Sequence, residues 1–264
     1  MNLDVVRSVT KKSLSRLPFA YDVGKKCYVS IKSKMDEIIF KSRYPKAKYI
    51  RFDANKIRSI KGDGYYSQYG QDYYLWNEIF SRQKQGFYVD IGGNDPVVNS
   101  NTYFLERQGW KGIAFDPLSR FEKMWGELRN AQFHRVAISD KTEMRDFIEI
   151  VPKIGWEHAL SGFKEFVREE DVAIYQHLDY KVETKPLSEF LDDSQKVDIL
   201  LVDVEGAEEM VFRGIDLARI APRYIMVENV REIGGQEGIR STIKNQGYEL
   251  IARIGIADDL FKRL

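Results

Sequence analysis

From residue 67 onward, short apolar runs alternate with segments whose apolar residues recur at helical spacing. Runs such as VDILLV (197–202) and YIMVE (224–228) place apolar side chains on both faces of an extended chain. Both faces are apolar when a parallel sheet is covered by helices on each side. The alternation therefore predicts a βαβ sheet protein of the α/β class.

The predicted elements follow one another regularly. We expect strands at 87–91, 111–115, 134–138, 145–150, 197–204, 224–228, 248–254 and 260–264. We expect helices at 73–82, 101–108, 120–129, 187–191, 208–214 and 234–245. The last two strands should form a closing hairpin around Ala257-Asp258-Asp259. The polar and aromatic stretch 152–180 fits no simple unit, and we interpret it as an insertion or lid.

Charge divides the chain into two parts. Sixteen Lys and Arg residues stand against five Asp and Glu residues before Gly62, although the net charge of the whole chain is +1. We predict that 1–60 is a basic, partly helical extension and that 61–264 is the main domain. A basic arm suits anionic lipid or nucleic acid, and a solvated extension is the alternative. No RNA-binding aromatic motif or zinc-finger spacing is present, so we do not expect a nucleic-acid partner.

Composition narrows the expected compartment. No apolar run approaches the roughly 20 residues that a membrane span needs. The polar start MNLDVVRSVTKK lacks the apolar core of a signal peptide. Cys27 is the only cysteine, which excludes an intrachain disulfide and a thiolate metal cluster. We therefore expect a cytoplasmic protein, located at the inner membrane surface if the basic arm contacts lipid.

The stretch GFYVDIGGNDP (86–96) begins like a nucleotide-binding loop, because an apolar strand runs into Gly92-Gly93. A dinucleotide loop needs two further glycines for the close approach of pyrophosphate, and Asn94 and Val97 stand at those positions. Pro96 lacks a backbone N–H, and the preceding carboxylate would repel phosphate. A tight turn without a ligand is the alternative for the glycine pair taken alone.

Acidic residues follow the predicted strands one after another. They are Asp90, Asp116, Asp140, Asp203, Glu205 and Glu228. Ligands bind beyond the carboxyl ends of strands in an open parallel sheet, and an acid some 20 residues after a glycine loop can accept both ribose hydroxyls. S-adenosylmethionine carries a sulfonium and an ammonium but no phosphate. The acidic edge therefore favours this cofactor over NAD.

Five blocks of sequence stand out in combination. They are SQYGQD (67–72), VDIGGNDP followed by SNT (89–102), LERQGWKGIAFDP (105–117), VAISD (136–140) and DILLVDVEGAEEMVFRGI (198–215). In order and approximate spacing they resemble FkbM-family methyltransferases, over residues 67–264. The resemblance implies a class I methyltransferase fold, Rossmann-like, with a seven-stranded, mostly parallel sheet and an antiparallel terminal hairpin. It also implies S-adenosylmethionine-dependent O-methylation of sugars, polyketides or glycan precursors, as in polysaccharide biosynthesis.

The resemblance also assigns cofactor contacts. It implies that the methionine part is held by Asp90, Gly92 and Asn94, the ribose by Asp116 with Pro117 behind it, and the adenine by Ala137, Ile138 and Asp140. Gln68 and Asp72 would close over the cofactor, with Ser100 and Asn101 nearby. Gly93 and Pro96 depart from the usual family loop. Leu201-Val202 stand where a basic residue often precedes D-x-E-G, so no inference about substrate charge is carried over.

Methyl transfer to a hydroxyl is an in-line displacement that needs a proton acceptor. Asp203 and Glu205 end the central strand and face the same side, with Glu228 at the next strand end, so we expect catalytic carboxylates there. Asp203 and Glu205 could also bind a divalent cation through oxygen ligands. Glu205 or the nearby Glu208 could instead cap the following helix. His158 is a further candidate base, whereas His134 is expected to pack within a strand.

The expected function is an S-adenosylmethionine-dependent O-methyltransferase that acts on a small-molecule or glycan acceptor. The basic arm favours an acceptor that is anionic or presented at a membrane, through peripheral contact. Homo-oligomerisation is left open. The alternatives are a non-catalytic cofactor-binding module of the same fold and an NAD-dependent sugar oxidoreductase or epimerase.

Overall fold

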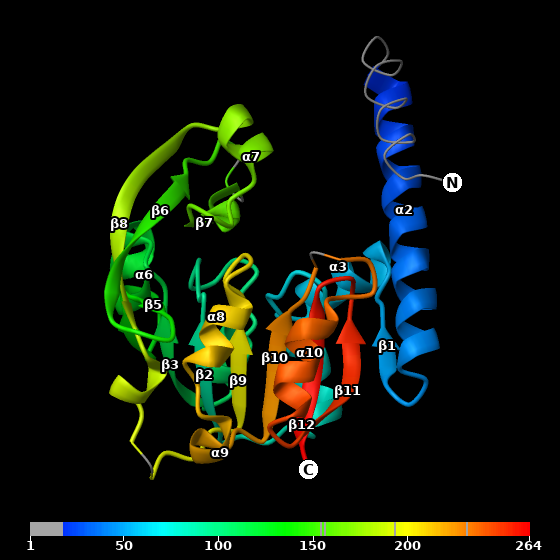
Figure 1. The fold of residues 1–264 in the computed structure, drawn as a ribbon. Helices are drawn as coiled ribbons and strands as arrows, with labels where there is room; N and C mark the ends of the chain where they lie inside the picture. The colour runs from blue at the N-terminus through cyan, green and yellow to red at the C-terminus, as the bar shows by residue number, and fades with distance from the viewer. Residues whose placement is uncertain (1–17, 154, 156, 193, 231) are drawn as a thin grey trace.

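The computed structural model describes the chain from Pro18 onward, apart from residues 154, 156, 193 and 231. Side-chain surroundings are described from Ile31 onward, so predictions for residues 1–17 lie outside the described residues. The first described element is a long helix, α2 (Pro18–Arg43), which stands at one edge of the molecule (Figure 1).

Eight strands form the main sheet (Figure 1). In spatial order they are β1 (Lys48–Ile50), β11 (Tyr248–Ile254), β12 (Asp258–Arg263), β10 (Tyr224–Glu228), β9 (Ile199–Val202), β2 (Phe87–Ile91), β3 (Lys111–Phe115) and β4 (Gln132–His134). All neighbours are parallel except the pairs that β12 makes with β10 and β11. The predicted class I fold with its antiparallel terminal hairpin is therefore confirmed.

The order of the strands reverses between β2 and β9. The chain runs outward from β2 through β3 to β4, and then returns to add β9 and β10 on the other side of β2. Such a switch point leaves a crevice at the carboxyl ends of the two central strands.

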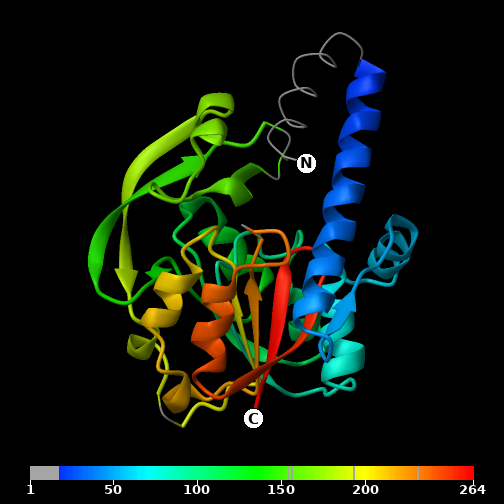
Figure 2. The ribbon, with the colours of Figure 1, turned by 45° about the vertical axis from the view of Figure 1, so that its right-hand side comes forward.

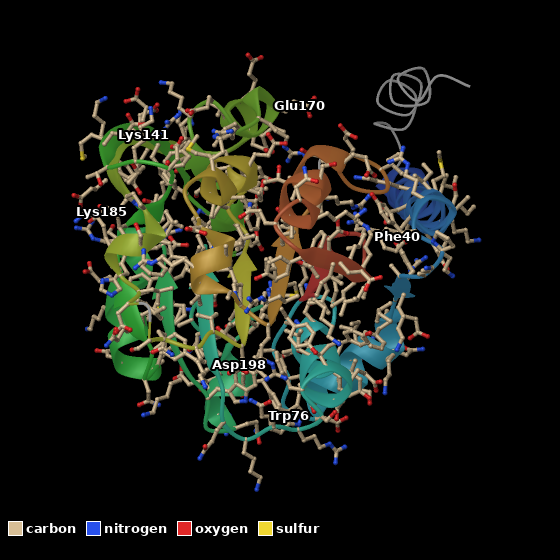
Figure 3. All side chains as sticks on the ribbon, turned by 60° about the horizontal axis from the view of Figure 1, so that its bottom comes forward. Phe40, Trp76, Lys141, Glu170, Lys185 and Asp198 are labelled. Carbon is tan, nitrogen blue, oxygen red and sulfur yellow. The ribbon has the colours of Figure 1, made fainter. Side chains whose placement is uncertain are left out.

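Alternate residues of the central strands enter two different cores. Val89 and Leu200 belong to the core beneath α2, α8 (Glu208–Arg213), α9 (Leu217–Ile220) and α10 (Glu237–Lys244). Tyr88 and Leu201 belong to the core beneath α4 (Gln71–Tyr74), the π-helix η1 (Leu75–Ile79) and α5 (Tyr103–Arg107). The labelled Phe40 and Trp76 belong to these two cores (Figure 3). The sheet is thus covered on both faces, as its apolar runs predict.

A second, four-stranded sheet has the order β5 (Ala137–Ile138), β8 (His177–Lys185), β6 (Glu143–Ile150) and β7 (Gly162–Phe163). With the 3₁₀-helix η2 (Glu157–Leu160) and α7 (Glu169–Ile174), it lies on the opposite side of the molecule from α2 (Figures 1 and 2). Helix α6 (Ser119–Leu128) joins the two sheets, because Trp125 packs in one apolar cluster with Ala114 of β3 and Phe147 of β6.

Two sequence predictions are wrong in this region. The predicted strand 134–138 is two strands in different sheets, because the chain turns where the N–H of Val136 donates to the carbonyl of His134 at 2.9 Å. The stretch 152–180, interpreted from the sequence as an insertion or lid, contributes η2, β7, α7 and the start of β8, and that interpretation stays a prediction. The predicted helix 187–191 is a single 3₁₀ turn, η3 (Leu187–Glu189).

The predicted N-terminal extension contributes to the main sheet. After α2 the chain forms β1, which pairs in parallel with β11 as an eighth strand, and then α3 (Ala54–Gly62). The hydropathy pattern does not predict β1, because a strand of three partly exposed residues has almost no alternation to detect.

A buried ion network holds α2 against the sheet. The guanidinium of Arg253 on β11 is fully buried and donates to Asp36 of α2 at 2.9 Å and to Asp259 of β12 at 2.8 Å. Asp259 also accepts from Arg240 of α10 at 2.8 Å. Asp36 accepts from the backbone N–H of Gly234 at 2.6 Å. Removing one partner from such a network leaves an uncompensated charge in a site without water.

We expect the substitution Asp36→Ala to lower the free energy of unfolding by about 3–5 kcal/mol, because Arg253 stays buried with one carboxylate partner fewer. Urea unfolding at pH 7 measures this change. The control is Glu37→Ala on the same helix, which removes a pair with the exposed Lys41 and should change the value by less than about 0.5 kcal/mol. Equal effects of the two substitutions would contradict the role of Asp36.

Candidate active site

A cavity of about 880 Å³ opens at the carboxyl ends of β2, β3, β9 and β10. This volume lies in the usual range for small-molecule sites. The second sheet supplies part of the wall through Phe147 and Phe163, and Ser161 before β7 adds to it. The position is the switch point at which open parallel sheets bind their ligands.

Most of the predicted site residues line this cavity. The predicted cofactor residues in its wall are Gln68, Asp90, Gly92, Asn94, Ser100, Asn101, Asp116, Pro117, Ala137 and Ile138. The predicted catalytic residues in its wall are Asp203, Glu205, Glu228 and His158. The wall also contains Gln71, Met226 and Asp258, which were not predicted.

Two predicted cofactor residues do not line the cavity. Asp72 is fully buried and accepts the backbone N–H of Tyr66 at 2.6 Å and that of Ser67 at 3.2 Å, so it shapes the turn that carries Gln68. Asp140 accepts the hydroxyl of Ser139 at 3.1 Å and lies 3.8 Å from Arg213. A direct contact between either carboxylate and a ligand in the cavity therefore has no support in this geometry.

Gly92 is required by the packing of the two central strands. Its φ is +87°, and a Cβ at this position would lie 1.7 Å from the carbonyl oxygen of Asp203. The neighbouring backbone is paired on both sides, since Gly92 donates to Phe115 and Asp203 donates to Ile91, each at 2.9 Å. The first glycine of the loop therefore serves the approach of β9 to β2, independently of any phosphate.

The rest of the loop replaces glycines with side chains that stabilise a turn. Asn94 adopts a left-handed backbone (φ +45°), a conformation that asparagine tolerates better than most residues. The carboxylate of Asp95 accepts the backbone N–H groups of Val97 at 2.9 Å and Val98 at 2.7 Å. These bonds turn the chain at Pro96 toward Ser100 and occupy N–H groups that a pyrophosphate would need.

Asp116 follows β3, and its carboxylate is held by backbone amides. One oxygen accepts the N–H of Asn94 at 2.9 Å, and the other accepts the N–H of Leu118 at 2.8 Å. Burial raises the pKa of Asp116 to about 6, although these two bonds lower it. Each oxygen retains a lone pair, so the carboxylate can still accept hydrogen bonds from a ligand in the cavity.

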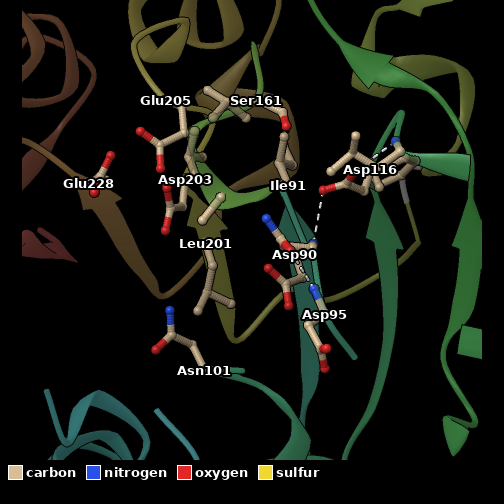
Figure 4. A pocket seen from close by; sticks show the side chains of 18 of the residues that line it. Asp90, Ile91, Asp95, Asn101, Asp116, Ser161, Leu201, Asp203, Glu205 and Glu228 are labelled. Atoms are coloured by element: carbon tan, nitrogen blue, oxygen red, sulfur yellow. Dashed lines mark hydrogen bonds between the residues drawn. The ribbon is translucent and has the colours of Figure 1, made fainter. Parts of the chain in front are cut away.

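An acidic cluster lies on the other side of the same cavity. One carboxylate oxygen from each of Asp203, Glu205 and Glu228 lies within 4.8 Å of the others (Figure 4). Asp258, the first residue of β12, stands directly opposite Glu228 in the antiparallel pairing and accepts from Gln71 at 2.8 Å. Asp116 lies across the cavity from the first three (Figure 4).

Crowding and burial disfavour full ionisation of this cluster. Burial raises the pKa of Asp203 well above its usual value, and the charge of Glu205 raises it further. Burial and then Asp203 raise the pKa of Glu228 in the same way. Carboxylates held this close disfavour one another's ionisation. The cluster can therefore accept or donate a proton, and it is complementary to positive charge.

The sequence of this site matches a known family. The family model described as "Methyltransferase FkbM domain" matches residues 90–250. The chain belongs to the FkbM methyltransferase family. The match contains most of the cavity wall, whereas α2, β1 and the segment with Gln68 and Gln71 precede it.

Two solved methyltransferase structures resemble this chain at low sequence identity. An FkbM methyltransferase from Methylobacillus flagellatus KT is 10% identical with a TM-score of 0.41, over 68% of this chain and 44% of that one. The chain thus covers less than half of that protein. Burkholderia thailandensis 1,6-didemethyltoxoflavin-N1-methyltransferase, solved with S-adenosylhomocysteine, is 7% identical with a TM-score of 0.40, over 88% and 91%. No curated protein matches the sequence.

The histidines and Glu208 have distinct positions in this FkbM protein. His158 in η2 lines the cavity, with its ring against Phe121 at 5.0 Å, and burial lowers its pKa. His134 packs between Phe115 and Phe190, as predicted for a strand residue. Glu208 accepts the backbone N–H of Gly206 at 2.9 Å, so its carboxylate holds the turn before α8, and a capping role in the helix itself stays a prediction. Within the described part of the chain, no helix has the length and apolarity to span a membrane.

The titration of Asp258 should make stability depend on pH. Burial raises its pKa to about 7, above the value of about 4 in an unfolded chain. The folded state thus holds the proton more tightly, so its stability falls as the pH rises from about 4 to about 7. The substitution Asp258→Asn removes this loss of stability, because an amide does not titrate in this range. The amide oxygen can still accept the hydrogen bond from Gln71.

We therefore expect the Asp258→Asn variant to gain in free energy of unfolding relative to wild type as the pH rises from about 4 to about 7, and the difference to level off above that range. Urea unfolding at four pH values, two inside this range and one on either side of it, measures the difference. The same difference at every pH would show that Asp258 does not titrate as described.

Proposed function

We propose that this protein is an S-adenosylmethionine-dependent O-methyltransferase that methylates a hydroxyl of a sugar, glycan or related natural-product acceptor. The observation that carries the proposal is the excess of acidic side chains in the cavity wall. The described wall contains seven carboxylates and no lysine or arginine. Such a wall is complementary to a sulfonium and an ammonium and repels a pyrophosphate, which argues against NAD.

An unsatisfied acceptor supports the same cofactor. The side-chain oxygen of Asn101 is buried in the cavity wall and has no hydrogen-bond partner. Among the buried side-chain nitrogen and oxygen atoms that the structure describes, it is the one without a partner. An orphaned buried acceptor costs free energy unless a ligand supplies a donor. The cofactor's ammonium group would supply one, beside the carboxylate of Asp90.

The chemistry divides between the two sides of the cavity. The bound cofactor would supply an electrophilic methyl group on its sulfonium. Asp116 would accept the ribose hydroxyls, with Ala137 and Ile138 beside the adenine. The acidic cluster would orient the acceptor hydroxyl and take its proton, for which a raised pKa is favourable. His158 is the alternative base. The cluster could also hold a divalent cation through its carboxylate oxygens.

The proposed acceptor is neutral at its reacting end. A phosphate or sulfate next to the hydroxyl would be repelled by the acidic cluster, and the described wall has no lysine or arginine to offset that repulsion. Hydroxyl-rich sugars meet the requirement, because carboxylates accept hydrogen bonds from vicinal hydroxyls. The excess of basic residues lies in the sequence before Gly62 and would serve peripheral contact with anionic lipid in the cytoplasm.

Calorimetry with S-adenosylhomocysteine and with NAD tests the cofactor. We expect binding of the first at micromolar concentration and no measurable binding of the second. The substitution Asp116→Asn should weaken binding at least about tenfold, as expected for the loss of hydrogen bonds to a charged group. The matched control is Asp140→Asn, the same change at a strand end outside the cavity, and it should bind like wild type. Tight binding of NAD alone would refute the proposal.

Label transfer from methyl-tritiated cofactor to sugar nucleotides, lipid-linked glycans and small alcohols, with and without chelator, tests the reaction. With an acceptor in hand, Asp203→Asn should lower kcat at least about 100-fold while leaving the affinity for S-adenosylhomocysteine within a few fold, because the proton acceptor acts after binding. The exposed Asp192→Asn is the control. Cofactor binding without transfer to any acceptor would favour the non-catalytic module.

A further inference from the structure

We infer that Arg129 is a positioning residue that aligns Asp90 with the cavity through the hydroxyl of Thr102. The inference rests on the proposed function, because it concerns the carboxylate expected to hold the cofactor's ammonium. Arg129 follows α6 on the chain and does not itself line the cavity.

Every nitrogen of the buried Arg129 guanidinium is used. Its Nε donates to Glu106 at 2.9 Å, which neutralises the charge. One terminal nitrogen donates to the carbonyl of Pro96 at 2.7 Å and to Ser100 at 3.4 Å. The other donates to Tyr88 at 2.8 Å and to Thr102 at 3.0 Å. A planar fork with fixed donors is thus spread over the glycine loop and the segment after it.

The contact with Thr102 leads to the cavity. The Thr102 hydroxyl accepts from Arg129 and donates to the Oδ2 of Asp90 at 2.7 Å. A hydroxyl has one proton, so acceptance from Arg129 leaves that proton for Asp90 and fixes its direction. Asp90 in turn lines the cavity and is nearly fully buried. This chain of hydrogen bonds from Arg129 through Thr102 to Asp90, called the relay below, therefore sets the rotamer of the Asp90 carboxylate.

Arg129 also fixes the loop on which the cofactor would rest. Its guanidinium lies over the Trp125 ring at 4.3 Å, and the Trp125 indole N–H donates to the carbonyl of Asn94 at 2.9 Å. Together with the bond to Pro96, these contacts hold the turn from both ends. Burial raises the pKa of Asp90, whereas the bond from Thr102 and the charge of Arg129 lower it.

The decisive variant is Thr102→Val, which keeps the Arg129–Glu106 pair and the shape of the side chain but removes the relay. We expect the affinity for S-adenosylhomocysteine to fall about tenfold at neutral pH, as expected for a hydrogen bond to a charged group. Thr102→Ser restores the hydroxyl and should recover most of the affinity. Thr142→Val, the same change at an exposed position, should bind like wild type.

The pH profile separates positioning from general loss of structure. Without the hydroxyl the pKa of Asp90 rises, so the affinity of the Thr102→Val variant should develop at higher pH than that of wild type. Asp116 and Asp203 also face Asp90, and Arg129 and Glu106 lie behind it. The contribution of Thr102 is therefore measured as the difference between the pH profiles of affinity of the variant and of wild type. Arg129→Lys keeps the charge without the fork and should behave like Thr102→Val.

The outcomes are distinct. If wild type binds S-adenosylhomocysteine and the Thr102→Val variant binds it with the same affinity and the same pH profile, the relay has no positioning role and the inference fails. If wild type itself does not bind, the proposed function fails first. Urea unfolding of each variant accompanies the binding data. If Arg129→Lys does not fold, the comparison of Thr102→Val with Thr102→Ser decides the question alone.

Discussion

The contact between Gly92 and the carbonyl of Asp203 is the constraint on which the site depends. It exists because β2 and β9 pair in parallel and end at the same level, so that the loop after one strand lies against the loop after the other. A side chain cannot enter this contact. The cavity is therefore bounded on one side by a loop that must begin with glycine and on the other by the carboxylates that follow β9.

The buried arginines Arg129 and Arg253 stabilise the elements on either side of that contact. Arg129 joins α6 to the glycine loop, and Arg253 joins β11 to α2 and β12. Burying a guanidinium is unfavourable unless its donors are matched, so each arginine tolerates few arrangements of its neighbours. The Arg129 network reaches the cavity carboxylate Asp90 through the hydroxyl of Thr102. The Arg253 network includes Asp259, which is the neighbour in sequence of the cavity carboxylate Asp258.

The strands could be predicted closely because their apolar runs are local signals. The segments 87–91, 111–115, 224–228 and 248–254 match the observed strands at both ends. The buried arginines could not be predicted, because their partners are distant in sequence: Arg253 and Asp36 are 217 residues apart. In the sequence, Arg129 is the basic last residue of a predicted helix, and only the tertiary structure shows that its guanidinium is buried. The turn at Val136 could not be predicted either, because it depends on β4 joining the main sheet and β5 joining the second sheet.

Asp258 shows why only part of the acidic cluster could be found from the sequence. The search for acids at the carboxyl ends of strands assumes parallel strands, whereas β12 runs antiparallel and begins at the edge where its neighbours end. Its first two residues point to opposite faces. Asp258 therefore joins the cluster, and Asp259 joins the network of Arg253. Through these adjacent residues the network that holds α2 extends to a cavity carboxylate, and both α2 and Asp258 lie outside the family match.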